Sequence, residues 1–391
     1  MSNEKNFNFF KRMKPANLKD IVTFIPKKIL NNDVQTIGLK KLFKVCRLIK
    51  IQDHTPDTVI SRFTSSEYLS GWITSCCYHP SGDYLAFGDY NNFSKIYYCN
   101  PIYKSTFGKE LLSFKDHEFC TNAVTFSHNL FGSCSTDGSV IIYNFNTSNK
   151  ESFGKKLLEL KEEDEVPIMS LSFSPDENYI TFANTENSVF IYCINERQVE
   201  EYGKKVFTIK GESGNVEYPK ICYSICGSFL FKAENQKFIT FDLNSRMDEK
   251  HFENLTLVEE DKILTISVNP NNDFVATGNL NGNIAIYSFY PQGSIKDKNL
   301  VEINRVIKDR NGNKNNVNFV LFSQTGKYLA SAGSDGFINL YDVDYQNIET
   351  SFGNKTHTIE ASYTLQFGLS FGKMDEYLAC CGWDCQVKII S

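Results

Sequence analysis

One stretch near the C-terminal end decides the fold: Phe322-Ser-Gln-Thr-Gly-Lys-Tyr-Leu-Ala-Ser-Ala-Gly-Ser-Asp-Gly-Phe-Ile-Asn-Leu-Tyr-Asp342. Short apolar and aromatic runs flank the Thr-Gly-Lys and Ser-Asp-Gly segments, which is typical of strands joined by tight turns. We interpret the stretch as the end of one strand, a turn, a second strand, another turn and a third strand. It therefore predicts a small antiparallel β-sheet.

The same pattern recurs along the chain. Clear copies are Tyr78–Gly88, Phe173–Ala183 and Val268–Gly278, and weaker copies lie around Phe126, Tyr223 and Phe371. The residues that close the third strand give the period, at 45 to 54 residues: Tyr98, Tyr143, Tyr192, Phe241, Tyr287, Tyr341 and Ile390. A fixed period of this length indicates a repeat architecture. The seven copies predict seven modules.

Each module also offers a fourth strand, for example 110–114, 156–160, 205–209 or 301–306. Short, regularly spaced strands favour a ring of sheets, because a ring protects strand edges. The predicted fold class is all-β: a seven-bladed β-propeller of four-stranded antiparallel blades, with a short, partly helical, basic N-terminal extension. Since the last copy stops at its third strand, we expect strand 58–63 to pair with 386–390 and close the ring.

Several of these pieces resemble the WD40-repeat family. Ser135–Tyr143, Ser334–Asp342 and Gly382–Ile390 are similar to its turn and third strand, and Asp116-His117 stands where the family usually has Gly-His. The resemblance covers about residues 58–391. Tyr, Phe or Ile replaces the family's Trp and most copies lack its His, so the Asp-His-Ser/Thr-Trp network should be incomplete in most blades. The turn and blade residues that the resemblance marks as structural are His117, Asp137, Tyr143, Asp335, Tyr341 and Asp384.

Charge divides the chain into two parts. Residues 1–50 hold twelve Lys or Arg against three acids, whereas residues 51–391 hold 29 bases against 43 acids. We therefore expect an N-terminal extension over 1–57 and a propeller over 58–391. Within the extension, apolar residues at helical spacing predict an amphipathic helix at about 37–51. Its polar face carries Lys40, Lys41, Lys44 and Arg47. This helix either lies on the acidic body or contacts RNA, a partner's groove or a membrane surface.

Four copies share an aromatic-Gly turn beside Lys, before the fourth strand. These turns are Phe107-Gly-Lys109, Phe153-Gly-Lys155-Lys156, Tyr202-Gly-Lys204-Lys205 and Phe352-Gly-Asn-Lys355. In the structural interpretation, Gly supplies a positive φ and the ring covers the blade's outer corner. In the alternative, rings and lysines form a docking crown on one rim. Under that alternative, the candidate residues for contact with a partner or a phosphate are the basic residues of the extension together with these: Phe107, Lys109, Phe153, Lys155, Tyr202, Lys204, Phe352 and Lys355.

Motifs for catalysis are missing from the sequence. It contains no Gly-x-Gly-x-x-Gly, phosphate loop, Gly-x-Ser-x-Gly or His-Glu-x-x-His. Cys222-x-x-x-Cys226 and Cys381-x-x-x-Cys385 lack further ligands at zinc-ribbon spacing. We therefore expect no enzyme activity, cofactor, metal or small-molecule substrate. No apolar run approaches the ~18 residues of a transmembrane helix.

The twelve cysteines lie mostly in apolar runs, and we expect no signal peptide in front of them. This pattern favours reduced core thiols and a location in the cytoplasm or nucleus.

Two functions fit the sequence. The first is a noncatalytic protein–protein interaction scaffold within a multiprotein complex, as the family resemblance implies. The second is a protein subunit of an RNA–protein assembly, in ribosome maturation or RNA processing, whose basic arm contacts RNA. The connections between third and fourth strands are long, about ten residues. Corresponding loops of a propeller share a face, so we expect unidentified partner proteins to bind that face or the rim.

Overall fold

The structure is a computed structural model of the 391-residue chain. It describes residues 59–64, 72–100, 103, 105–162, 164–211, 219–243, 254–271, 274–289, 301–308, 316–343, 352–361, 366–382 and 384–390. The helix expected at about 37–51, with Lys40, Lys41, Lys44 and Arg47, lies outside these residues.

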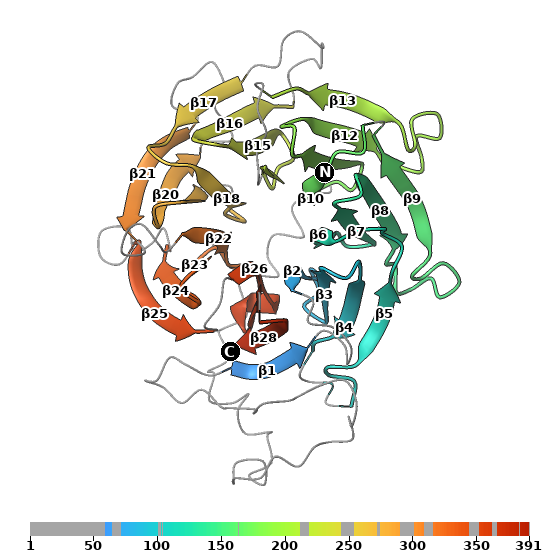
Figure 1. Cartoon of the computed structure of the whole chain (residues 1–391), viewed down its shortest axis with the longest axis horizontal. Helices are drawn as coiled ribbons and strands as arrows, with labels where there is room; N and C mark the ends of the chain where they lie inside the picture. The colour runs from blue at the N-terminus through green and yellow to red at the C-terminus, as the bar shows by residue number, and fades with distance from the viewer. Residues whose placement is uncertain are drawn as a thin grey trace, which may run out of the picture. The chain divides into compact units, whose positions relative to one another are not determined.

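Seven four-stranded antiparallel sheets lie around a common axis as blades (Figure 1). The predicted fold class, a seven-bladed propeller, is confirmed. Blade 1 holds β2 (Ile73–Tyr78), β3 (Tyr84–Asp89), β4 (Ser94–Tyr98) and β5 (Glu110–Phe114). Blade 2 holds β6 (Thr121–Phe126), β7 (Leu130–Ser135), β8 (Ser139–Asn144) and β9 (Lys156–Lys161). Blade 3 holds β10 (Ile168–Phe173), β11 (Tyr179–Asn184), β12 (Val189–Cys193) and β13 (Lys205–Ile209).

The second half repeats this order. Blade 4 holds β14 (Lys220–Tyr223), β15 (Phe229–Glu234), β16 (Lys237–Asp242) and β17 (Asn254–Val258). Blade 5 holds β18 (Ile263–Val268), β19 (Phe274–Asn279), β20 (Asn283–Phe289) and β21 (Val301–Lys308). Blade 6 holds β22 (Val317–Phe322), β23 (Tyr328–Gly333), β24 (Phe337–Asp342) and β25 (Asn354–Glu360). Blade 7 holds β26 (Gln366–Phe371), β27 (Leu378–Gly382), β28 (Gln386–Ile390) and, from the other end of the described chain, β1 (Val59–Thr64).

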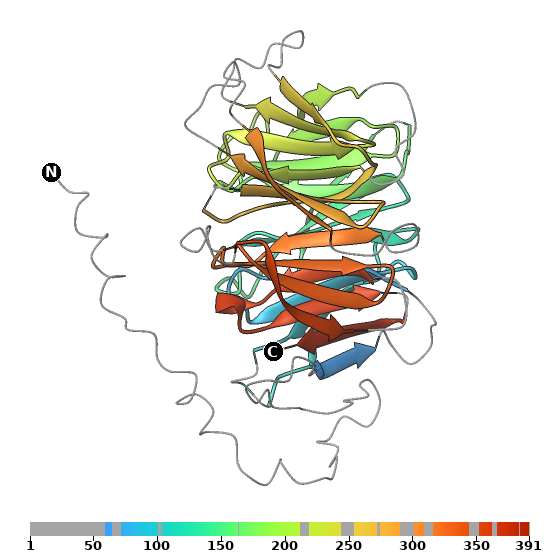
Figure 2. The same ribbon diagram turned by 90° about the vertical axis from the view of Figure 1, so that its left-hand side faces the viewer.

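The ring closes where β1 meets β28 (Figure 2). The two strands are antiparallel, and their register places Val59 opposite Ile390 and Thr64 opposite Gln386. Blade 7 thus combines a strand from before the repeats with three strands from the end of the chain. This pairing gives β28 a neighbour on both sides, so its backbone does not form an open edge.

Burial explains why the blades stand side by side. Second strands such as β7 and β15 are buried almost throughout, whereas the outer strand β25 is mostly exposed. Apolar clusters join neighbouring blades: one contains Ala86 and Ile96 of blade 1 together with Phe131 and Tyr143 of blade 2. A single sheet has no such cover for both faces, so each blade depends on its neighbours for its core.

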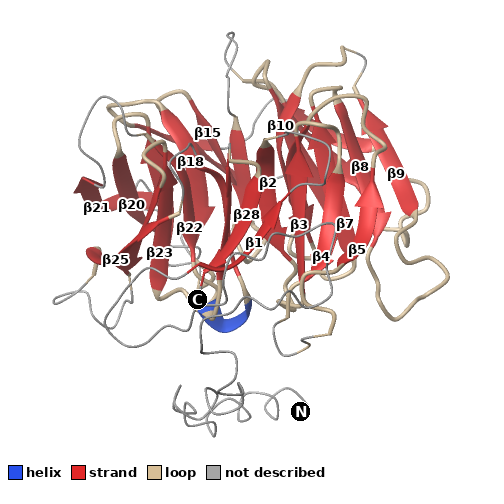
Figure 3. Ribbon diagram, turned by 60° about the horizontal axis from the view of Figure 1, so that its bottom comes forward, coloured by secondary structure: helices blue, strands red, loops and turns tan. Residues whose placement is uncertain are grey.

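Strand direction defines two faces of the ring. The turns between first and second strands and between third and fourth strands form one face, here called the ab face. The turns between second and third strands, and the connections into each first strand, form the opposite bc face. In the described residues, helical conformation is confined to a 3-10 turn in blade 7, η5 (Lys373–Asp375), on the ab face (Figure 3).

One position in blade 1 differs from the sequence interpretation. Tyr98 was expected to close the third strand, but the equivalent of Tyr143 is Tyr97. Tyr97 pairs with Leu85, as Tyr143 pairs with Phe131. Two adjacent tyrosines made the periodic position ambiguous, and the side chain that points between the blades, 1% exposed, is Tyr97.

Candidate functional site

Exposed aromatic side chains gather on the bc face of blades 1 and 2. Trp72 precedes β2, Tyr90 follows β3 and Phe119 precedes β6; they are 42%, 56% and 59% exposed. The rings of Trp72 and Tyr90 lie 5.3 Å apart, and the Tyr90 amide donates to the Trp72 carbonyl. We call these three residues the aromatic patch. Contiguous exposed aromatic side chains mark interaction sites, because aromatic residues are enriched in the core of protein interfaces.

Backbone contacts fix the patch to the ring. Asn92, in the same turn as Tyr90, donates its side-chain amide to the carbonyl of Glu118 at 2.7 Å. Phe119 follows Glu118, and its own carbonyl accepts a hydrogen bond from Ser135 at 3.0 Å. These bonds join the blade 1 turn to the connection that enters blade 2. The patch therefore sits on a backbone that two blades hold in place.

The aromatic-Gly turns lie on the ab face, opposite the patch. Gly108, Gly154, Gly203 and Gly353 all have φ between 73° and 76°, so each adopts the left-handed conformation that glycine favours. In the first three turns, the aromatic amide donates to a carbonyl four residues earlier, as Phe153 does to Asn149 at 3.0 Å. The positive φ that the structural interpretation required is present in all four copies.

The rings of these turns point into the blades and the lysines point outward. Phe352 is 2% exposed and lies 5.1 Å from the ring of Phe274 in the preceding blade. Phe107, Phe153 and Tyr202 are partly buried against neighbouring apolar residues or the cleft between blades 2 and 3. The exposed members are Lys109, Lys155, Lys204 and Lys355. The turns thus present cations on the surface, with the aromatic rings largely covered.

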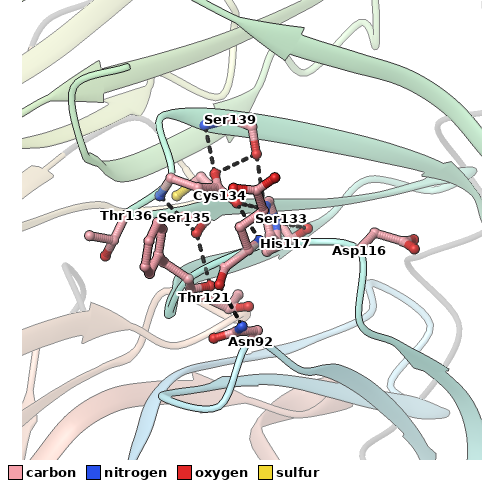
Figure 4. Close-up of polar contacts among 12 residues, drawn as sticks. Asn92, Asp116, His117, Thr121, Ser133, Cys134, Ser135, Thr136 and Ser139 are labelled. Atoms are coloured by element: carbon pink, nitrogen blue, oxygen red, sulfur yellow. Dashed lines mark hydrogen bonds and ion pairs between the residues drawn. The ribbon is translucent and has the colours of Figure 1, made fainter.

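His117 is the centre of a buried polar network in blade 2 (Figure 4). Its Nε2 lies 2.8 Å from Ser133 Oγ, and its Nδ1 lies 3.0 Å from Ser139 Oγ and 3.2 Å from Asp137 Oδ2. Burial by itself raises the pKa of Asp137, but hydrogen bonds from His117 and Ser139 outweigh burial and lower that pKa well below its usual range. The network is internal, and it joins the connection before β6 to β7 and β8.

Family comparison agrees with this geometry. The family model described as "WD domain, G-beta repeat" matches residues 59–97 and 304–342, which lie in modules of the seven-bladed ring. The chain is a WD40-repeat β-propeller. No curated protein matches it. WD40 propellers are commonly protein-interaction scaffolds, and they are typically noncatalytic.

This WD40 propeller replaces the family's Trp in several blades by a tyrosine that bonds to a carboxylate. Their hydroxyls donate to carboxylates as follows: Tyr97 to Glu110 at 3.1 Å, Tyr143 to Asp116 at 2.8 Å, Tyr192 to Glu162 at 2.6 Å and Tyr287 to Glu259 at 2.7 Å. Burial first, and the adjacent carboxylate second, raise the pKa of Tyr143 and of Tyr192, so both hydroxyls stay protonated donors. A tyrosine therefore supplies both the packing and the satisfied polar atom that this position needs.

Asp335, Tyr341 and Asp384 are the remaining residues that the resemblance marks as structural, and they lie in blades 6 and 7. Asp335 accepts the amide of Phe337 in the β23–β24 turn, and Tyr341 is 1% exposed. Asp384 forms an ion pair with the buried Lys388 in blade 7.

A polar cleft of about 580 Å³ opens on the ab face between blades 2 and 3. Two of its three acidic residues, Asp176, Glu177 and Glu196, accept hydrogen bonds from nearby protein groups. Glu177 accepts the amides of His128 and Asn129 in the neighbouring blade, and Asp176 accepts from Ser174 and Asn178 in its own turn. These bonds give Asp176 and Glu177 a structural role at the cleft.

Cysteines of the propeller do not assemble into a metal site. No disulfide joins the eleven described cysteines, and the described residues contain no group of three or more His, Cys, Asp or Glu suited to a metal ion. Burial raises the pKa of the Cys77 thiol to about 11 and that of Cys120 to about 12, which lowers their reactivity. The described residues also include no helix long and apolar enough to cross a membrane.

The sequence interpretation did not find the aromatic patch. Trp72 and Phe119 each come just before a first strand, and Tyr90 lies in a turn. A position outside the strands was the available signal, but the covered rings of the aromatic-Gly turns share it. The sequence alone therefore does not separate exposed from covered aromatic residues at turns.

Proposed function

We propose that this WD40 propeller is a noncatalytic scaffold that holds partner proteins within a multiprotein complex, and that the aromatic patch is one of its contact surfaces. The supporting observation is that Trp72, Tyr90 and Phe119 are each more than 40% exposed while their backbone is fixed by two blades. Rigid aromatic residues lose little conformational freedom on binding and frequently dominate interface energies. The patch lies on the bc face, whereas the long third-to-fourth connections lie on the ab face.

We further propose a location in the cytoplasm or nucleus. Cys76 and Cys77 in blade 1 and Cys380 and Cys381 in blade 7 are adjacent in the chain and carry free thiols. Reduced thiols fit a compartment in which glutathione and thioredoxin keep cysteines reduced.

The experiment compares two double variants of the full chain. Tyr90→Ser/Phe119→Ser changes the patch, and Tyr103→Ser/Val199→Ser changes two similarly exposed residues on the ab face. Proteins that co-purify with each tagged chain are quantified by mass spectrometry, and thermal unfolding verifies that both variants fold. We expect at least one stoichiometric partner to fall about tenfold or more with the patch variant alone. Equal retention of every partner by both variants would contradict the proposal.

A second candidate function rests on the charge of residues 1–50, where bases exceed acids by nine. In this alternative the propeller is a subunit of an RNA–protein assembly and the basic arm neutralises phosphates. Such contacts release counterions, so binding of a single-stranded RNA probe to the full chain should fall about tenfold or more between 50 and 200 mM salt. A chain that lacks residues 1–50 is the matched control, and equal RNA binding by both chains excludes the arm.

A further inference from the structure

One residue in each blade marks the start of the second strand, next to the turn on the ab face. In all seven blades its carbonyl accepts the amide of the residue that directly follows the first strand. Six of these seven equivalent residues are aromatic: Tyr84, Tyr179, Phe229, Phe274, Tyr328 and Tyr377. The seventh, in blade 2, is Leu130. Leu130 therefore departs from an aromatic position that every other blade keeps.

Blades 1 and 2 show what fills the space around this position. The ring centre of Tyr84 lies 5.6 Å from that of Tyr98, its partner on the third strand, and 5.2 Å from that of Phe145 in blade 2. The ring centre of Phe145 lies 5.2 Å from that of Phe153, the aromatic residue of the aromatic-Gly turn. Four rings therefore pack together on the ab side of this junction.

The next junction, between blades 2 and 3, keeps one of these four rings. Strand register and the backbone hydrogen bonds of the turns give the equivalents of Tyr84, Tyr98, Phe145 and Phe153, in this order, as Leu130, Asn144, Ile194 and Tyr202. All four equivalents line the cleft of about 580 Å³ between blades 2 and 3. The cleft therefore lies where three rings of the preceding junction have no aromatic equivalent.

The inner wall of the cleft is apolar. Ile142 and Ile194 are 1% and 5% exposed and belong to the core between blades 2 and 3, and Leu130 and Leu158 are half-buried against the same core. Tyr202 is half-buried beside them. An aromatic ring that enters removes a large apolar area from water and can pack against the ring of Tyr202. In lining and size, the cleft suits an aromatic side chain.

The rim of the cleft carries an excess of negative charge. Its ionisable groups, besides the Tyr202 hydroxyl, are three carboxylates and one guanidinium: Asp176, Glu177, Glu196 and Arg197. The donors to Asp176 and Glu177 are neutral amides and one hydroxyl, so they leave both negative charges uncompensated. Burial first and the charge of Glu196 second raise the pKa of Tyr202, which shows that Glu196 acts on the ring that lines the cleft. Such a rim attracts cationic side chains.

We propose that the cleft between blades 2 and 3 binds an aromatic side chain of a partner protein, flanked in the partner's sequence by lysine or arginine. The ring takes the place that aromatic residues fill between blades 1 and 2, and the basic neighbours contact the carboxylates of the rim. An aromatic side chain also loses little conformational freedom when it is held. This inference rests on the proposed scaffold function, because it gives the scaffold a second contact site, on the face opposite the aromatic patch.

The test measures thermal unfolding of the full chain with the peptide acetyl-Lys-Phe-Lys-amide as the probe. Acetyl-Lys-Ala-Lys-amide has the same charge without the ring and is the matched control peptide. At about ten times the dissociation constant, the phenylalanine peptide should raise the unfolding midpoint by about 2 °C over the alanine peptide. Equal midpoints with the two peptides would overturn the proposal.

Variants that fill the cleft give the second readout. Leu130→Phe introduces the residue type of the other six blades, so it should remove the difference between the peptides. Its midpoint without peptide should equal or exceed that of the wild type, because it restores the repeat. Asn144→Tyr, at the equivalent of Tyr98, should have the same two effects. The control Val199→Phe adds a ring to an exposed residue of the same face outside the cleft, and it should keep the difference.

Three further outcomes bear on the proposal. A folded Leu130→Phe chain that keeps the peptide difference would place the binding elsewhere and overturn it. A lower midpoint for both cleft variants without peptide would show that the cleft has no room for a ring, which also overturns it. Glu196→Gln should weaken binding of the phenylalanine peptide about twofold to fivefold, whereas a larger effect of acetyl-Glu-Phe-Glu-amide on the wild type would contradict a basic partner. None of these outcomes depends on the aromatic patch, whose own variants test the scaffold function separately.

Discussion

Asp137 shows what a single residue contributes to this propeller. It accepts the amides of Glu118 and Ser139, at 2.9 and 2.8 Å, and contacts His117. Because these bonds lower its pKa in the folded state, ionised Asp137 stabilises the fold above the unfolded-state pKa of about 3.9. That contribution is lost as the pH falls through this value toward the lower folded-state pKa.

We therefore expect Asp137→Asn to reduce the free energy of unfolding by a constant amount above about pH 5 and by progressively less below about pH 4. Urea unfolding of the wild type and the variant across this pH range measures the gap between them. A gap that stays constant down to pH 3 would show that the charge of Asp137 does not stabilise the fold.

Residues of the same network also show how far the sequence could lead. The resemblance identified His117, Asp137 and Tyr143 because they hold the family's positions. The sequence interpretation did not find the carboxylates that pair with the tyrosines. Asp116, Glu162 and Glu259 precede their tyrosines by 27, 30 and 28 residues, a spacing that could have marked them. Glu110 instead follows Tyr97 by 13 residues, and only the fold identifies that pair.

At the scale of the element, the aromatic-Gly turns combine a predicted feature with an unpredicted one. The glycines of these turns predicted a backbone with positive φ, and all four have a positive φ in the structure. The orientation of the rings depends on contacts with a neighbouring blade: a Cβ at Gly154 would lie 3.0 Å from Leu112 of blade 1. The local sequence of a turn does not show which residues of the neighbouring blade lie beside it. Two interpretations of the rings therefore stayed open, one in which they cover the blade's outer corner and one in which they form a docking surface.

Gly154→Ala tests the turn directly. Alanine at a φ of 76° carries the cost of the left-handed conformation, so the free energy of unfolding should fall by about 1–2 kcal/mol in urea unfolding experiments. Lys155→Ala, at the exposed neighbour, should change it by less than about 0.5 kcal/mol. Equal effects of the two substitutions would mean that the turn tolerates a side chain and that glycine is not required there.

At the scale of the whole molecule, the repeat period predicted the seven blades because every copy must bury the same faces against its neighbours. The surfaces could not be predicted in the same way, because a partner selects them and the repeat does not. The aromatic patch consists of three residues in the turns and connections of blades 1 and 2, outside the strands that the repeat specifies. Departures from a repeat are therefore the places to look for function in this propeller.

Closure of the ring is the central claim about the fold, because the seventh blade is complete only if β1 joins β28. The most direct measurement is thermal unfolding of two truncated chains, one without residues 1–50 and one without residues 1–64, which also lacks β1. The first should unfold in one cooperative transition close to that of the full chain, and the second should show no cooperative transition, since β28 and blade 7 lose their outer strand. Indistinguishable transitions of the two chains would contradict a ring closed by β1.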